Sequence, residues 1–207
     1  MRGFVVRFQI LVAASAVTSV LLASCGSNSQ SPESDAKAAN LQLAATHRPE
    51  SEIGFLRILG LAKSAYGQAT SEMTKAGVRG QRSNAICNLL RKGRKATDWT
   101  GVIADVRPNS EGRGIVSIEL GDGVEVRTWN NLLSDIGDDT LIEPTSPLFE
   151  QISQLSPGDP VKFSGRFFEN ERDCITVMDG TSVRMILTYP AFLMRFSKIE
   201  KLSADKS

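Results

Sequence analysis

The sequence is poor in the residues that build metal centres and catalytic triads. Its 207 residues include one histidine and three cysteines, which leaves little room for a zinc site or a histidine-based triad. It has no CxxC pair, no G-x-S-x-G elbow, no HExxH motif and no phosphate-binding P-loop. We therefore expect no enzymatic activity, no metal and no cofactor.

An excess of charge of one sign is also missing. The chain has 24 Lys and Arg against 23 Asp and Glu, a formal net charge of +1. General polyanion binders usually carry a clear basic excess, so the charge balance argues against nucleic acid as a partner. The length suits one folded domain better than two.

The longest apolar run lies near the amino terminus. It extends from Ile10 to Leu22 and is too short for a comfortable transmembrane helix. Arg2 and Arg7 precede it, and no acidic residue occurs before Glu33. A basic start followed by a short apolar stretch is typical of a secretory signal peptide.

The apolar run ends in Leu22-Ala23-Ser24-Cys25, followed by Gly26. This tetrapeptide resembles the lipobox of bacterial lipoproteins, whose cysteine is diacylated and becomes the first residue of the mature protein. The alternative is an ordinary secretory signal with a cysteine by chance. The resemblance implies a signal peptide over residues 1–24 and a membrane partner held through lipid on Cys25. Gly26 in place of Asp implies sorting to the outer membrane, facing the periplasm.

Residues 25–49 contain many Ser, Asn, Gln, Ala and Pro and no aromatic residue. A segment of this composition buries too little apolar area to offset the entropy lost on ordering. We expect a flexible tether here, with His47 playing no chemical part.

Once Cys25 is lipidated, Cys87 and Cys174 remain, and the compartment is oxidising. An even remainder of cysteines predicts one disulfide, closing a loop of 87 residues between a helix and a strand. A reactive thiol is the alternative, but no histidine lies near either cysteine in the sequence.

Helical periodicity covers the first folded part. Apolar residues from Glu50 to Ala76 fall on one face of a helix, and a second short helix is expected from about Gln81 to Leu90. These helices form a predicted helical cap over residues 50–95.

From Asp98 onward the apolar period changes to two, which indicates strands. Turn residues separate the runs, and Ser146 followed by Pro147 predicts the start of a short helix reaching about Leu155. Phe163 and Phe167 are expected inside the sheet structure. The expected strands are 98–106, 114–120, 124–130, 161–168, 174–178, 183–187 and 192–199.

The order of three meandering strands, a helix and further strands matches an OB-fold. We predict an α+β protein, in which an N-terminal helical segment precedes a small OB-like Greek-key β-barrel of five or six strands over residues 96–202. The strings that follow resemble a group of uncharacterised bacterial proteins with an OB-like domain, similar to the tRNA-anticodon-binding-like OB families. They are 129–138 (WNNLLSDIGD), 140–142 (TLI), 146–149 (SPLF), 158–159 (GD), 163–165 (FSG) and 195–197 (RFS). The resemblance covers about residues 50–202 and implies the fold, not tRNA binding.

Two loops are candidate contact surfaces because small barrels bind through loops and exposed sheet: 107–113 and 131–145. In the second, four acidic residues could offer oxygen ligands to Ca²⁺, but they lack EF-hand spacing, so a hydrogen-bonded loop is expected. Trp129 and Phe168 are the better candidates for exposed aromatic residues, although core positions are favoured for both. The candidate binding residues here are Trp129, Asn130, Asn131, Asp135 and Asp138.

The strongest run of charge, residues 91–95, is basic and includes Arg94 and Lys95. It is either a solvated connector or a contact for an anionic lipid, polymer or nucleic acid. The favoured function is a non-catalytic binding module for an envelope protein partner or ligand. Binding of an anionic polymer, lipid or nucleic acid through this run and the sheet is the alternative, and a hydrolase is a third, weaker hypothesis.

Overall fold

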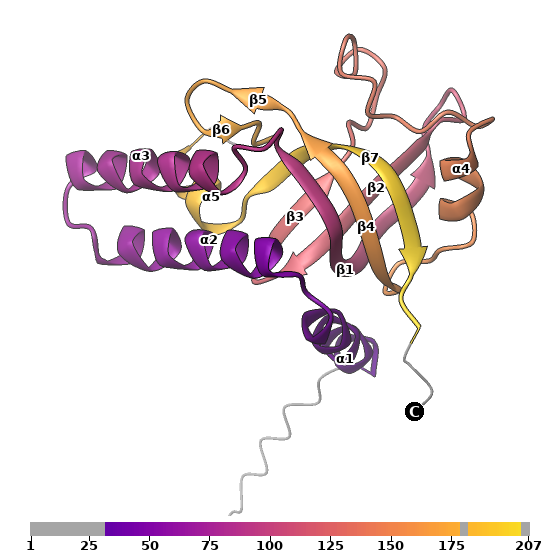
Figure 1. Cartoon of the computed structure of the whole chain (residues 1–207), viewed down its shortest axis with the longest axis horizontal. Helices are drawn as coiled ribbons and strands as arrows, with labels where there is room; N and C mark the ends of the chain where they lie inside the picture. The colour runs from indigo at the N-terminus through magenta and orange to yellow at the C-terminus, as the bar shows by residue number, and fades with distance from the viewer. Residues whose placement is uncertain (1–31, 179–181, 204–207) are drawn as a thin grey trace, which may run out of the picture. The chain divides into compact units, whose positions relative to one another are not determined.

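The structure is a computed structural model that describes residues 32–178 and 182–203. The predicted signal peptide and Cys25 lie outside the described residues. Within them the chain combines helices with a small barrel, an α+β arrangement (Figure 1). The helices are α1 (Pro32–Thr46), α2 (Glu50–Gln68), α3 (Glu72–Leu89), α4 (Pro147–Ile152) and α5 (Val183–Thr188). The strands are β1 (Lys95–Pro108), β2 (Gly114–Gly121), β3 (Val124–Arg127), β4 (Pro160–Phe167), β5 (Glu169–Asn170), β6 (Cys174–Ile175) and β7 (Ala191–Lys201).

Five strands close the barrel in the order β1-β2-β3-β7-β4. The long strand β1 pairs with β4 along its first half and with β2 along its second half. Neighbours run antiparallel except β3 and β7, whose short parallel pairing completes the closure. Gly101 and Gly165 sit where strands approach closely: a Cβ atom at Gly165 would lie 2.7 Å from the carbonyl oxygen of Arg195. Side chains at these two points would force the barrel apart.

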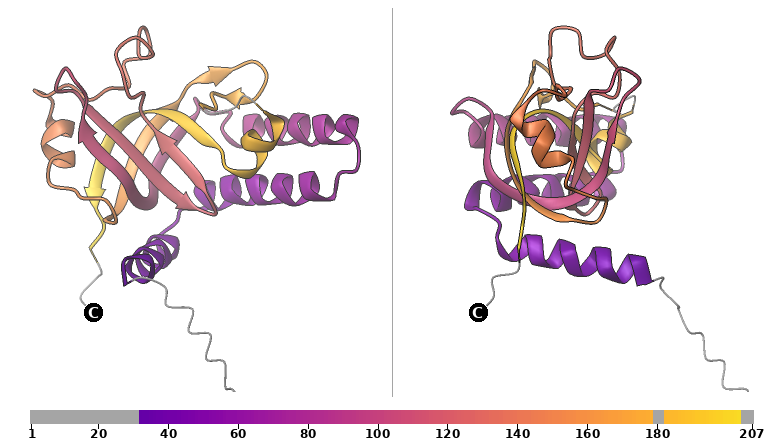
Figure 2. Two further views of the ribbon diagram at one scale, coloured as in Figure 1. Left: turned by 180° about the vertical axis from the view of Figure 1, so that it is seen from behind. Right: turned by 90° about the vertical axis from the view of Figure 1, so that its right-hand side faces the viewer.

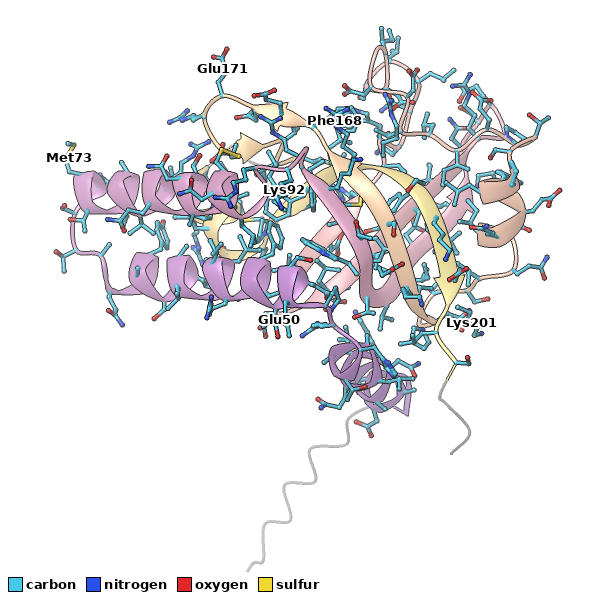
Figure 3. All side chains as sticks on the ribbon, in the orientation of Figure 1. Glu50, Met73, Lys92, Phe168, Glu171 and Lys201 are labelled. Atoms are coloured by element: carbon cyan, nitrogen blue, oxygen red, sulfur yellow. A yellow bond between two sulfur atoms is a disulfide. The ribbon has the colours of Figure 1, made fainter. Side chains whose placement is uncertain are left out.

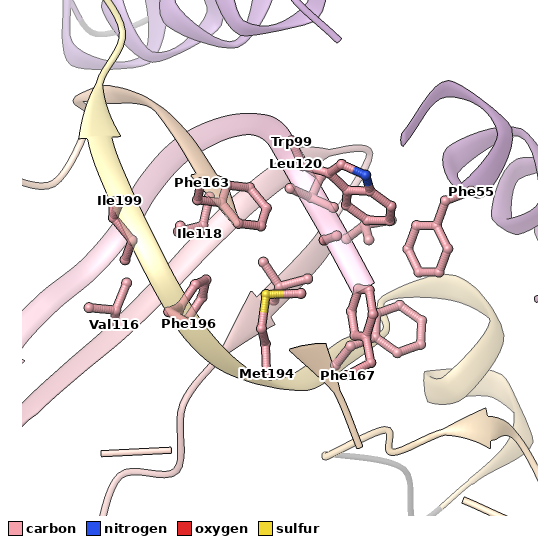
Figure 4. Close-up of a cluster of buried hydrophobic side chains, with 14 of the residues drawn as sticks. Phe55, Trp99, Val116, Ile118, Leu120, Phe163, Phe167, Met194, Phe196 and Ile199 are labelled. Atoms are coloured by element: carbon pink, nitrogen blue, oxygen red, sulfur yellow. The ribbon is translucent and has the colours of Figure 1, made fainter. Parts of the chain in front are cut away.

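The core fills the barrel interior and continues under α2. Phe55 of α2 is fully buried, and its ring centroid lies 5.1 Å from that of Trp99, 5.7 Å from Phe167 and 5.2 Å from Phe192 (Figure 4). Phe163 is also buried, so the prediction that the strand phenylalanines fill the barrel is confirmed. The helix α2 therefore closes one end of the barrel with an aromatic side chain.

The expectation of a flexible tether over residues 25–49 is wrong for the part that the structure describes, because α1 occupies residues 32–46. Ala44 is fully buried, and its carbonyl accepts a hydrogen bond of 2.7 Å from the hydroxyl of Thr100. Asn40 donates to the carbonyl of Gly158 at 2.9 Å. The composition that suggested disorder is also rich in alanine, the best helix former, and long-range contacts hold the helix in place.

Two element predictions are corrected. A helix expected from Glu50 to Ala76 ends at Gln68, because Ser71 begins α3 by accepting a hydrogen bond of 3.1 Å from the backbone N–H of Thr74. Residues 183–187, expected as a strand, belong to helix α5, where Ser182 caps the start by accepting from the N–H of Met185. In both places a serine side chain accepts a hydrogen bond from a backbone N–H group of the first helical turn and so favours a helix start there. The spacing of apolar residues did not reveal either helix start.

The short helix predicted after Ser146 is confirmed as α4. Pro147 occupies its first turn, and the hydroxyl of Ser146 accepts a hydrogen bond of 3.2 Å from the N–H of Phe149. The helix is shorter than predicted and ends at Ile152.

The structure places Cys87 of α3 and Cys174 of β6 at disulfide distance, with Cα atoms 5.5 Å apart. Beside this link, Asp173 is buried and accepts hydrogen bonds from Arg79 at 2.8 Å and from Arg82 at 3.2 Å. Burial alone would raise the pKa of Asp173, but the hydrogen bond from Arg79 and the two guanidinium charges hold it below its usual range. A covalent link and an ion cluster thus join α3 to the β5–β6 hairpin.

Removing the link by Cys87→Ala together with Cys174→Ala should lower the free energy of unfolding by about 2–5 kcal/mol. Without the cross-link, the unfolded chain has more conformational entropy. Urea titration followed by circular dichroism measures the change. An unchanged midpoint for the double variant, compared with the oxidised parent chain, would contradict the role of this pair.

A second buried carboxylate anchors α2 to β1. Glu52 is fully buried and accepts hydrogen bonds from the backbone N–H of Thr100 at 2.7 Å and from Arg48 at 3.0 Å. Burial raises the pKa of Glu52 from 4.5 to about 7, against the opposing effects of Thr100 and Arg48. The folded state therefore binds this proton more tightly than the unfolded state does.

A raised pKa in the folded state adds stability that is complete below pH 4.5 and is lost as the pH rises through about 7. Thermal unfolding of the parent chain should accordingly occur at lower temperature at pH 8 than at pH 5. Glu52→Gln should reduce this difference, whereas Glu50→Gln, which changes an exposed residue of the same helix end, should leave it unchanged. Identical pH profiles for the parent and Glu52→Gln would refute this assignment.

Candidate functional site

A groove of about 430 Å³ crosses the outer face of β1, β2 and β3. Its volume lies in the range of pockets that hold small ligands or short peptide segments. Its walls come from the three strands, the residues that follow β3, and Met178. The lining residues are Ala104, Asp105, Arg107, Ile115, Val116, Ser117, Glu125, Arg127, Thr128, Trp129, Asn130 and Met178.

A row of polar side chains crosses the floor of this groove. Strand register places Asp105 opposite Ser117, and Ser117 opposite Arg127, so an acid, a hydroxyl and a base lie side by side on three strands. Asp105 accepts a hydrogen bond of 2.8 Å from Arg107, and Ser117 donates one of 2.9 Å to Glu125. The groove therefore presents both carboxylates and guanidinium groups, which suits hydrogen bonding to a polar chain.

Trp129 forms the rim of the groove and is half-buried. Its backbone N–H donates to the hydroxyl of Thr140 at 2.8 Å, and its indole N–H donates to the carboxylate of Asp138 at 2.9 Å. The backbone carbonyl of Asp138 in turn accepts a hydrogen bond from Arg195 of β7. Two predicted residues, Trp129 and Asp138, are thus brought together, and they tie the loop after β3 to the barrel.

The side chain of Asp135, a predicted contact residue, points into its own loop and not to the surface. Its carboxylate is buried and accepts from the N–H of Thr140 at 2.6 Å, from the hydroxyl of Thr140 at 2.7 Å and from the N–H of Leu141 at 3.1 Å. Three donors within the loop satisfy most of the roughly four acceptor sites of this carboxylate, and removing the acceptor would leave buried N–H groups without a partner. Asp135 therefore sets the loop conformation that positions Trp129.

Asn130 is exposed at the groove, whereas Asn131 serves the turn beside it. The side chain of Asn131 donates to that of Asn130 at 2.7 Å and accepts from the N–H of Ser134 at 2.9 Å. This matches the turn-forming use of asparagine. Of the pair, only Asn130 lines the groove.

Arg94 and Lys95 lie at the start of β1 and do not line this groove. Arg94 pairs with Glu169, and Lys95 lies opposite Arg166 of β4. The alternative hypothesis, in which the basic run 91–95 and the sheet bind an anionic polymer, lipid or nucleic acid, thus concerns a different surface of the barrel from the one that Trp129 borders.

Three of the four charged strand residues of the groove were missed from the sequence, whereas the fourth, Arg107, begins the candidate loop 107–113. Two pairs carry the pattern that could have identified them: an acid followed two residues later by an arginine, each time on a strand. Residues two apart point to one face, so Asp105 with Arg107 and Glu125 with Arg127 marked a charged outer face. Which strands would lie side by side was not readable from the pattern.

In residues 32–178 and 182–203, His, Cys, Asp and Glu side chains form no group of three or more suited to hold a metal ion. In the same ranges no helix combines the length and hydropathy needed to span a bilayer. Comparison with models of protein families, with curated proteins and with solved structures finds no match.

The loop offers a direct test of its internal support. Asp135→Asn replaces a carboxylate that accepts three hydrogen bonds by an amide, and it should lower the free energy of unfolding by about 1–3 kcal/mol. It should also shift the fluorescence of Trp129 to longer wavelength, because the rim loses its support while Trp99 stays buried. Asp139→Asn makes the same charge change at an exposed position of this loop and serves as the control. Equal effects of the two variants would contradict the role of Asp135.

Proposed function

We propose that this chain is a lipid-anchored, non-catalytic binding module of the bacterial cell envelope. The proposed location is supported by the basic start, the short apolar run and the lipobox-like tetrapeptide that ends at Cys25. Gly26 favours the outer membrane, facing the periplasm. A cysteine pair at disulfide distance is consistent with such an oxidising compartment, where disulfides form and persist.

We also propose that the barrel is an OB-fold with Greek-key connections. Three consecutive antiparallel strands, β1 to β3, are followed by helix α4 and strand β4. The last barrel strand, β7, enters between β3 and β4 and runs parallel to β3. In OB-folds the face of the second and third strands and the adjoining loops bind ligands. That face carries the groove in this chain.

The ligand that fits the groove best is an extended segment of an envelope protein. The observation that carries this proposal is the row Asp105–Ser117–Arg127, which mixes both charges with a hydroxyl and runs beside Trp129. A polyanion would be repelled by Asp105 and by Glu125. A peptide has donors, acceptors and side chains of either charge, so it can satisfy both kinds of group at once.

Site-specific photo-crosslinking tests this proposal in the full chain. A photoreactive amino acid at Asn130 should capture a defined envelope protein, whereas the same amino acid at Asn84, exposed on α3, should not. Arg107→Glu should weaken capture at position 130 about tenfold, because it places an acid beside Asp105.

Arg57→Glu makes the same charge change on the exposed surface of α2 and should leave capture unchanged. Equal crosslinking from positions 130 and 84, or capture that ignores Arg107→Glu, would reject the groove as the binding site. Thermal unfolding of each variant shows whether the barrel itself is intact.

A further inference from the structure

Three cations stand side by side on the outside of the barrel, away from the groove. Strand register places Lys95 of β1 opposite Arg166 of β4, and Arg166 opposite Arg195 of β7. All three side chains are exposed. Like charges directly opposite each other in a sheet are destabilising, so this row has an energetic cost.

Acids lie near this row but pair with only one of its three cations, because Glu169, which lines the hollow beside Arg166, pairs with Arg94. Arg195 donates to the carbonyl of Asp138 and lies 3.6 Å from Asp139, and its guanidinium lies 5.5 Å from the ring centroid of Phe168. In the described part of the chain, Lys95 and Arg166 have no ion pair. A hollow of about 200 Å³ opens at this row, lined by Arg166, Phe167, Phe168, Glu169 and Arg195.

Further cations extend the row. Arg91 and Lys92 are exposed in the turn that leads into β1, and Figure 3 labels Lys92 and Phe168 on the side turned to the viewer. Together with the three strand residues they make five exposed cations on, or just before, the strands β1, β4 and β7. Clusters of four to eight Lys or Arg residues attract anionic membrane surfaces.

The loop anchored by Arg195 adds an apolar contribution. Leu133 and Ile136 are 84% and 77% exposed, among the most exposed large apolar side chains in the described residues. The loop between β3 and α4 stands off the barrel in every view (Figures 1 and 2). The buried carboxylate of Asp135 holds it in shape, so these two side chains are presented to solvent by a hydrogen-bonded loop.

We propose that the cationic row and the apolar-tipped loop dock the barrel on a bilayer that contains anionic phospholipid. Phosphate groups would neutralise Lys95 and Arg166, while Leu133 and Ile136 would enter the boundary between headgroups and acyl chains. A nucleic acid fits less well, because Arg195 already lies over the ring of Phe168 and exposed aliphatic tips gain little from a polyanion in water. This docking goes beyond the groove and does not depend on acylation of Cys25.

A tryptophan placed at the tip reports the contact. Leu133→Trp in the full chain is mixed with vesicles of phosphatidylcholine alone or of phosphatidylcholine with phosphatidylglycerol. Its emission, taken as the difference from the parent chain, should shift to shorter wavelength with the anionic vesicles only. The shift should fade as salt is added. All variants are identical before residue 32, so any attachment through that part of the chain is equal in each and cancels in the comparison between variants.

Matched charge removal assigns the effect to the row. Lys95→Gln with Arg166→Gln should weaken partitioning into anionic vesicles by about 10- to 30-fold. Arg57→Gln with Arg184→Gln removes two exposed cations elsewhere and should leave partitioning nearly unchanged. Leu133→Ser with Ile136→Ser should weaken partitioning while retaining its dependence on salt.

Three results would overturn the docking proposal. These are a shift that is equal with phosphatidylcholine alone, an equal loss in both charge variants, or binding of an oligonucleotide by the parent chain with no partitioning into anionic vesicles. Crosslinking at Asn130 is measured separately, so failure here leaves the groove proposal standing, and the reverse also holds. Thermal unfolding confirms that each variant is folded.

Discussion

Closure of the barrel by the parallel pairing of β3 with β7 is the constraint on which the other features depend. This pairing involves only three residues of β3, Glu125 to Arg127, yet it joins strands that are more than sixty positions apart in the sequence. On its other side β7 pairs with β4 and so aligns Arg195 with Arg166. It also leaves the outer face of β1, β2 and β3 open as a groove. Two separate polar surfaces result from one closure.

The loop after β3 connects these two surfaces. At one end Trp129 borders the groove, and at the other Arg195 holds the carbonyl of Asp138 beside the cationic row. Asp135 fixes the conformation of the loop by accepting hydrogen bonds from the N–H groups of Thr140 and Leu141. A partner bound in the groove and a bilayer at the loop tip would therefore both contact the loop that follows β3.

Local patterns predicted much of the fold and part of the site. The cysteine count led to the Cys87–Cys174 pair, alternation led to the strands, and Ser146-Pro147 led to α4. Of the candidate binding residues, Trp129 and Asn130 line the groove, and Trp129 is half-buried there rather than in the core position that was favoured for it. Errors arose where long-range contacts outweighed composition: α1 is ordered by the bonds of Ala44 and its neighbours to the barrel, and Asp135 is buried by its own loop.

By itself, the sequence determined the class of the fold, the strand faces and the cysteine pair, because these depend on periodicity and residue chemistry over short distances. Tertiary structure alone decided which strands became neighbours. The row Asp105–Ser117–Arg127 and the row Lys95–Arg166–Arg195 exist only because of that register. A shift of one residue along a strand turns its side chains to the opposite face. The sequence thus determines which charged residues each strand carries, and the closed barrel determines which of them lie side by side.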